Sequence, residues 1–162
     1  MKKRILSLLC VLALCLGLLP TTALAAAEGA PSMLYVGNQQ VIVAETVTYW
    51  TTDDSGELTR VYDDNDWNVK YDPNTATLTL IEATITGSGD IASTSNGAGI
   101  YAKGSSNQPV ALTIELIGMN TITGNYGIYV NAEMSNESYG TNASLTITGQ
   151  GSLDVSGSSH GI

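Results

Sequence analysis

Carboxylates gather in two short polar turns of the chain, and carboxylates bind metals. The members are Asp53, Asp54 and Glu57 in the first turn, and Asp63, Asp64 and Asp66 in the second. Calcium prefers hard oxygen ligands and takes about 6–8 of them, so these turns are candidate calcium sites. Neither turn has the ligand spacing of an EF-hand loop. The alternative is an ordinary acidic turn exposed to water.

Two tyrosines, Tyr101 and Tyr129, stand at equivalent positions of two Gly-Ile-Tyr motifs. Successive side chains of a strand point to opposite faces, so a tyrosine that follows an inward isoleucine is expected to point outward. Exposed rings hold the flat apolar face of a sugar, and their hydroxyls add hydrogen bonds. The pair is a candidate glycan-binding platform. The alternative is a cross-strand pair that only stabilises the sheet, by about 0.2–1 kcal/mol.

We expect no catalytic residue in this chain. His160 is the single histidine, and it fills the same slot before Gly-Ile as Ala98 and Tyr126, so a variable repeat position explains it. Glu82 and Glu115 are candidates for the carboxylate pair that glycoside hydrolysis uses, but no Lys or Arg stands at a matching slot. The alternative for these two acids is a solvated acidic face. We therefore expect that the protein is not an enzyme.

The composition bounds the class of protein and its partners. The chain has 162 residues, with 6 Lys and Arg against 15 Asp and Glu, and a net charge of −9. That length allows one domain at most. Nucleic acid is excluded as a partner, because phosphate neutralisation needs clustered cations. No cofactor other than calcium is expected.

Residues 1–25 have the pattern of a secretory signal peptide. A basic start and the apolar run 5–19 precede Ala23-Leu24-Ala25, so cleavage is expected between Ala25 and Ala26. The run is shorter than the ~20 apolar residues that a spanning helix needs, which favours a removed leader over a retained membrane anchor. Both cysteines lie in the leader. The exported chain therefore has no disulfide and no thiolate chemistry.

Residues 26–74 and residues 75–162 differ in pattern. The first segment alternates short β-branched and Tyr-rich runs with Gly, Asn and Asp turns, which is typical of antiparallel strands. We expect it to form an N-terminal β cap. Trp50 and Trp67 in this cap would cover the end of the structure that follows, because the ends of repeat proteins need protection.

Three short motifs recur in the same order across residues 75–162, at spacings near 33 and 34 residues. They are Leu78-Thr79-Leu80, Leu112-Thr113-Ile114 and Leu145-Thr146-Ile147, then Thr84–Gly87, Thr121–Gly124 and Asp154–Gly157, then Gly99–Tyr101, Gly127–Tyr129 and Gly161-Ile162. The order predicts a parallel β-helix (solenoid) of about two and a half coils, with equivalent aliphatic side chains above one another inside. A β-sandwich is the alternative fold. The expected columns are Leu78/Leu112/Leu145, Leu80/Ile114/Ile147, Ile85/Ile122/Val155 and Ile100/Ile128/Ile162.

These repeats, with the lead-in Trp67–Pro73 before Thr77-Leu78-Thr79-Leu80, resemble the right-handed parallel β-helix (pectin-lyase-like) repeats of exported bacterial surface proteins. The resemblance implies the N-terminal part of a large secreted protein of the carbohydrate-binding or adhesin-like kind. In such proteins the helix runs for more coils. Because the third coil is incomplete at Ile162, we expect a fragment.

Together these patterns predict an exported, extracellular or cell-surface protein with a structural or adhesive role and weak glycan binding. Its expected partner is a polysaccharide or cell-wall glycan. The alternative is the N-terminal portion of a polysaccharide lyase or glycoside hydrolase whose catalytic coils lie beyond residue 162.

Overall fold

The computed structural model describes residues 26–87, 97–105, 108–132 and 142–162, and every regular element in these ranges is a β strand. The strands are β1 (Met33–Val36), β2 (Gln39–Gln40), β3 (Thr48–Thr52), β4 (Leu58–Val61), β5 (Val69–Asp72), β6 (Thr77–Ile81), β7 (Thr84–Thr86), β8 (Ile100–Lys103), β9 (Val110–Ile117), β10 (Met119–Tyr126), β11 (Ile128–Asn131), β12 (Ala143–Gly149) and β13 (Ser152–His160). The all-β expectation is confirmed.

The predicted leader, residues 1–25, lies outside the described residues, so its structure and the Ala25 side of the predicted cleavage site are not described. Ala26 is exposed. Within the described ranges, no helix has the length and apolar character needed to cross a membrane.

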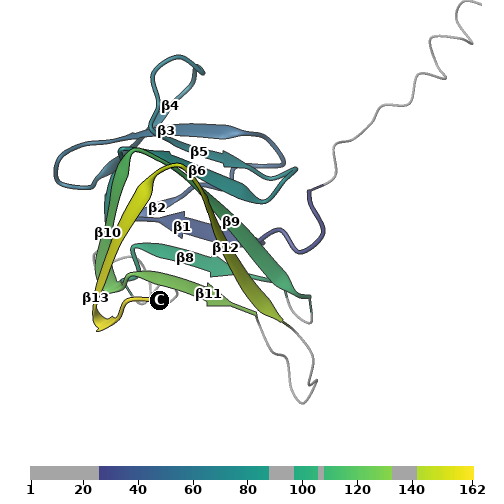
Figure 1. Ribbon diagram of the computed structural model, residues 1–162. Coiled ribbons are helices and arrows are strands. Elements are labelled where there is room, and N and C mark those ends of the chain that lie inside the picture. Colours follow the sequence, from purple (N-terminus) through teal and green to yellow (C-terminus); the bar gives the residue numbers. More distant parts are fainter. Residues whose placement is uncertain (1–25, 88–96, 106–107, 133–141) are drawn as a thin grey trace, which may run out of the picture.

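The strands form three sheets around one interior (Figure 1). The first sheet has the order β11-β8-β1-β2, the second β13-β10-β7 and the third β12-β9-β6-β5-β3-β4. Along the chain, β6, β7 and β8 visit the third, second and first sheet in turn. The strands β9, β10 and β11 repeat this path, and β12 and β13 follow its first two steps. We call these stretches the first, second and third pass, and each strand lies parallel to its counterpart in the pass before.

The segment 26–74 extends two of the sheets with antiparallel strands. In the first sheet, β1 pairs with the first-pass strand β8, and in the third sheet β5 pairs with β6. The strands β3 and β4 continue the third sheet outward. Trp50 on β3 is 5 % exposed and belongs to the core. Trp67, half-buried, packs against Tyr49 with 5.7 Å between ring centroids.

Most of the expected aliphatic pairs are in register. Ile122 pairs with both Ile85 and Val155, Ile128 pairs with Ile100, and Leu112 pairs with Leu145. Leu145 and Val155 are partly buried, and the other side chains in these pairs are almost wholly enclosed. The Ile128 amide donates to Gly161 as the Ile100 amide donates to Gly127, which continues the column of these two isoleucines toward Ile162. The side chain of Ile162 is 70 % exposed, so the expectation that it is enclosed was wrong.

The expected alignment of Leu78 with Leu112 was also wrong. Leu78 pairs with Ile114, two residues further along, and Leu80 pairs with Leu116. A shift of two residues keeps the same side chains inside, because side chains alternate between the faces of a strand. The corner after the strand sets the alignment: Ile81 pairs with Ile117, and the next residue of each pass has a positive φ, 47° at Glu82 and 67° at Gly118.

A buried asparagine ties the corners of the three passes together. The Asn120 side chain is 2 % exposed. Its Oδ1 accepts a hydrogen bond from the Ala83 amide of the first pass at 2.9 Å. Its Nδ2 donates to the carbonyl oxygens of Ile117 at 3.1 Å and of Ser152 in the third pass at 3.4 Å. The corner therefore has its buried polar groups partnered by one side chain.

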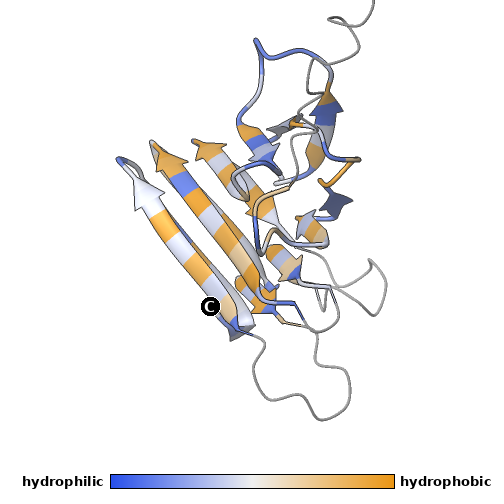
Figure 2. Cartoon of the chain, turned by 90° about the vertical axis from the view of Figure 1, so that its right-hand side faces the viewer, coloured by the Kyte–Doolittle hydropathy of each residue, from blue (hydrophilic) through white to orange (hydrophobic). Residues whose placement is uncertain are grey.

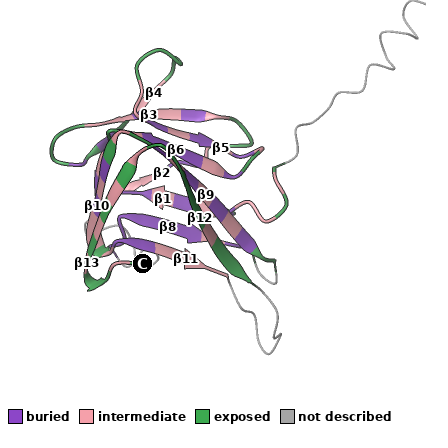
Figure 3. Cartoon of the chain, viewed as in Figure 1, coloured by how far each residue is buried: buried purple, intermediate pink, exposed green. Residues whose placement is uncertain are grey.

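The core lies between the sheets and thins toward the third pass. Strands in Figure 2 carry alternating apolar and polar bands, as expected for strands with one face in the core. In β9 every second residue is buried, from Val110 to Leu116. In β12 only Leu145 is half-buried and the other residues are exposed, which Figure 3 shows as the change from purple to green. The aliphatic side chain of Ile147 is 42 % exposed.

Candidate functional site

A row of four rings runs across the passes, and we call it the aromatic row: Tyr101, Tyr129, Tyr126 and His160. The ring centroids of Tyr101 on β8 and Tyr129 on β11 lie 5.5 Å apart at an angle of 43°. Tyr129 and Tyr126 stack at 5.3 Å and 23°, and Tyr126 and His160 at 5.2 Å and 3°. These separations are in the range of favourable aromatic pairs.

The predicted tyrosine pair is thus in contact, but only part of the row is accessible. Tyr101 is 4 % exposed. It lies in the middle of the sheet, between Tyr129 on one side and Tyr35 of β1, its direct partner, on the other. Its ring therefore has no free face for a ligand. Tyr129 and Tyr126 are half-buried and His160 is exposed, so these three rings form the accessible part of the row.

Glycines position the row, because the passes approach each other closely beside it. The amide of Gly127 donates to the carbonyl oxygen of His160 at 2.9 Å, and Ile128 donates to Gly161 at 2.9 Å. A Cβ atom at Gly127 would collide with the side chain of Val155 and with the carbonyl oxygen of Gly161. Glycine is therefore required there.

His160 and Tyr126 occupy the same slot of successive passes, as the repeat predicted. The imidazole ring of His160 lies flat on the ring of Tyr126, with 3° between the ring planes. No interaction described for His160 involves a carboxylate. Sequence reasoning named this slot but missed Tyr126 as a member of the row. The signal was present, because equivalent slots of a parallel stack place their side chains in contact.

The two wall carboxylates do not face each other across neighbouring strands. Glu115 pairs with Thr79, and its Oε2 accepts a hydrogen bond from the Thr79 hydroxyl at 3.1 Å. Glu82 lies at the corner beside Gly118. This arrangement offers Glu115 a structural partner, and it does not support a catalytic pair.

The acidic turns bind their own backbone. The Asp53 carboxylate accepts hydrogen bonds from the Ser55 hydroxyl at 2.6 Å, the Ser55 amide at 2.9 Å and the Glu57 amide at 3.0 Å. These bonds, with the Ser55 hydroxyl first, hold the pKa of Asp53 below its ordinary value of 3.8. In the second turn, Asp63 accepts from the Asn65 amide at 3.2 Å.

All six acids named for calcium are exposed. Among the described residues, no three His, Cys, Asp or Glu side chains come together in a group that would hold a metal. The turns are explained as self-capped acidic turns, and nothing in their geometry adds support to the calcium hypothesis.

Comparisons with protein families, with curated proteins and with solved structures found no match to this chain. The site must therefore be interpreted from its own geometry.

Proposed function

We propose that the chain is an exported surface protein built as a parallel β-helix, whose aromatic row holds the apolar face of a glycan. The path of the passes through three sheets in a fixed order, with parallel in-register pairing, supports this architecture. The secretory pattern of residues 1–25 supports export. The observation that carries the binding proposal is the stack of Tyr129, Tyr126 and His160 on the surface.

The accessible rings suit a sugar for two reasons. Their faces and edges are apolar, and pyranose rings have apolar C–H faces that pack against them. Their polar atoms, two phenol hydroxyls and the imidazole nitrogens, provide hydrogen bonds at the edge of the same surface. Next to them, the hydroxyls of Ser158 and Ser159 donate to Asn125 Oδ1 at 2.9 and 2.7 Å.

The charge of the protein favours a neutral glycan over an acidic one. The net charge is −9. Of the cations, Arg60 lies over the Trp50 ring at 6.0 Å and Lys70 over the Trp67 ring at 5.1 Å, both in the third sheet and not in the row. One cation, Lys103, lies two residues beyond Tyr101 on β8, opposite Asn131 of β11. The preference for a neutral glycan therefore rests on the net negative charge of the whole chain, which repels anionic polymers.

A polysaccharide-binding assay tests the proposal. Wild-type protein should bind a neutral cell-wall or plant glycan, and Tyr129→Ala should weaken that binding about tenfold or more, which corresponds to about 1.4 kcal/mol. Tyr129→Phe should retain most of it, because the stacking ring remains. Tyr62→Ala is the matched control, since Tyr62 is 86 % exposed and lies outside the row. Binding that is absent, or equal in Tyr129→Ala and wild type, would overturn the proposal.

A further inference from the structure

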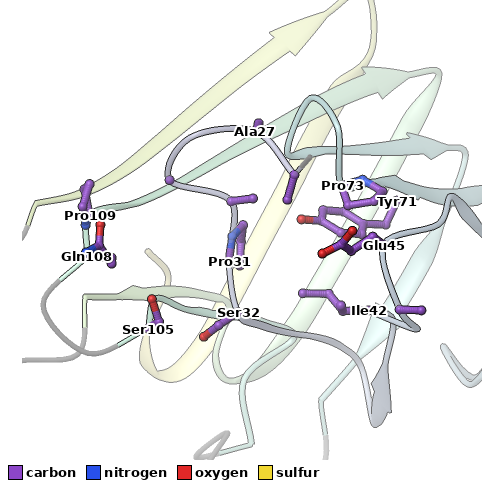
Figure 4. Close-up of a pocket in the computed structure, with 14 residues that line it drawn as sticks. Ala27, Pro31, Ser32, Ile42, Glu45, Tyr71, Pro73, Ser105, Gln108 and Pro109 are labelled. Carbon is purple, nitrogen blue, oxygen red and sulfur yellow. The ribbon is translucent and has the colours of Figure 1, made fainter. Parts of the chain in front are cut away.

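A cavity of about 440 Å³ lies away from the aromatic row, between the segment 26–32, the turn that follows β5, and residues 105, 108 and 109 (Figure 4). Its size falls within the ~300–1,000 Å³ typical of small-molecule sites. Its walls are mainly apolar, formed by alanines, by Ile42 and by Pro31, Pro73 and Pro109. Segments far apart in the sequence therefore meet around one hollow.

One wall residue, Tyr71, is a buried polar group without a partner. It is 1 % exposed, and its hydroxyl has no hydrogen-bond partner within the described structure. In Figure 4 the ring points its hydroxyl into the cavity, toward Pro31. Its backbone is fixed in the sheet between Thr48 and Leu78, so the ring is held in place. A buried hydroxyl left unpaired is unfavourable, and a ligand that accepts its hydrogen bond would recover that cost.

The protonation of Tyr71 defines which partner it needs. Burial, with the negative charge of Asp72 as a second cause, raises the pKa of Tyr71 from 10.0 to about 12. The phenol therefore stays protonated at physiological pH and acts as a donor. The ligand must offer an acceptor, and a carbonyl oxygen is a strong neutral one.

The only charged side chain that lines the cavity among the described residues is Glu45. It lies beside Tyr71 in the view of Figure 4. Its carboxylate accepts hydrogen bonds and disfavours an anionic ligand. The preceding residue, Ala44, has a φ of 56°, a left-handed conformation that is unfavourable for a residue other than glycine. Such strain is concentrated at ligand sites.

We propose that this cavity binds an N-acetylhexosamine unit of a glycan. The acetamido carbonyl accepts the hydrogen bond of the Tyr71 hydroxyl. The acetyl methyl packs against the wall of alanine and Pro31, and the sugar hydroxyls donate to Glu45. A sugar without the acetamido group offers no carbonyl, and a uronic acid would meet Glu45 with like charge. This site is separate from the aromatic row and does not depend on the function proposed for it.

Titration of the full chain with N-acetylglucosamine, followed by amide NMR shifts, tests the inference. We expect saturable shifts centred on Tyr71 and Glu45. Glucose and glucuronic acid should bind at least tenfold more weakly. Tyr71→Phe removes only the hydroxyl and should weaken N-acetylglucosamine binding at least tenfold while the protein stays folded. Tyr62→Ala is the control, with unchanged affinity expected.

Three results would each overturn the inference. The first is no shift with N-acetylglucosamine in a folded protein. The second is equal affinity of wild type and Tyr71→Phe. The third is tighter binding of a blocked alanine peptide, N-acetylalanine methylamide, which offers the same carbonyl and methyl without a sugar. Shifts centred on Tyr129 instead of Tyr71 would assign the sugar to the aromatic row and would likewise reject the cavity while leaving the proposed function intact.

Discussion

At the scale of single residues, the phenol of Tyr71 sets the behaviour of the cavity. Its hydroxyl is buried without a described partner, so replacing it with hydrogen removes a desolvated polar group and no hydrogen bond of the free protein. We expect Tyr71→Phe to leave the free energy of unfolding at neutral pH unchanged or to raise it by about 1 kcal/mol. Urea unfolding measures this. A loss of 2 kcal/mol or more would mean that the hydroxyl has a partner.

Tyr71 also makes the free energy of unfolding depend on pH in the alkaline range. The pKa of Tyr71 is about 12 in the folded protein against 10.0 ordinarily. The folded state therefore holds this proton more tightly, and its contribution to stability is complete below pH 10 and falls between pH 10 and about 12 as the unfolded chain ionises. The free energy of unfolding of wild type should therefore fall relative to that of Tyr71→Phe across that window.

Asn120 shows how much one side chain contributes at a corner. Its replacement by alanine leaves the buried Ala83 amide without its acceptor and removes donors to the carbonyls of Ile117 and Ser152. We expect Asn120→Ala to cost about 2–4 kcal/mol, because buried groups left unpaired are expensive. Asn120→Asp should be similarly destabilising at neutral pH, since a carboxylate cannot donate. Thermal unfolding of both variants measures this, and a cost below about 0.5 kcal/mol would contradict it.

At the scale of elements, the repeated motifs predicted the columns wherever the motif lies at the same distance from the corner between strands in successive passes. Ile122 and Val155 align as expected, and so do Leu112 and Leu145. The first pass differs, because Leu78 lies three residues before Ile81, whereas Leu112 lies five residues before Ile117, the partner of Ile81. The motif Leu-Thr-Leu alone does not contain that difference, so the alignment of Leu78 could not be read from it.

The columns predict a graded cost of core truncation in the second sheet. Ile122 is 0 % exposed between Ile85 and Val155, whereas Val155 is only partly buried. We expect Ile122→Ala to destabilise by about 3 kcal/mol, because it removes buried methyl groups and leaves a cavity. Val155→Ala should cost about 1 kcal/mol, in proportion to its smaller burial. Denaturant unfolding of the two variants is the measurement, and equal costs would contradict the packing described.

At the scale of the whole molecule, the aromatic row and the cavity, our two proposed binding sites, depend on segments that lie far apart in the sequence. The repeat placed Tyr101 and Tyr129 in contact, but their accessibility also depends on β1, which pairs with β8 and leaves Tyr101 enclosed. The cavity at Tyr71 needs the segments near Pro31, Glu45 and Pro109 in one place. No sequence pattern in any of these segments predicts that it contacts the others. The cavity could therefore be found only in the three-dimensional structure.

The stability of the molecule should fall from the second pass toward the third. The strands β9 and β10 have a paired neighbour on both sides and bury their inner face. The strands β12 and β13 pair on one side among the described residues and are largely exposed. We expect amide hydrogens of β12 and β13 to exchange faster than those of β9 and β10. Equal protection in the two passes would contradict this gradient.

The most direct test of the account is the parallel stacking of equivalent residues, because both the core columns and the aromatic row rest on it. Nuclear Overhauser effects between side chains measure it in solution. The account predicts cross-peaks from the Ile122 methyl groups to both Ile85 and Val155, and between the rings of Tyr126 and His160. Contacts instead between strands that follow each other in the chain, as in the hairpins of a β-sandwich, with no Ile122 to Val155 cross-peak, would contradict it.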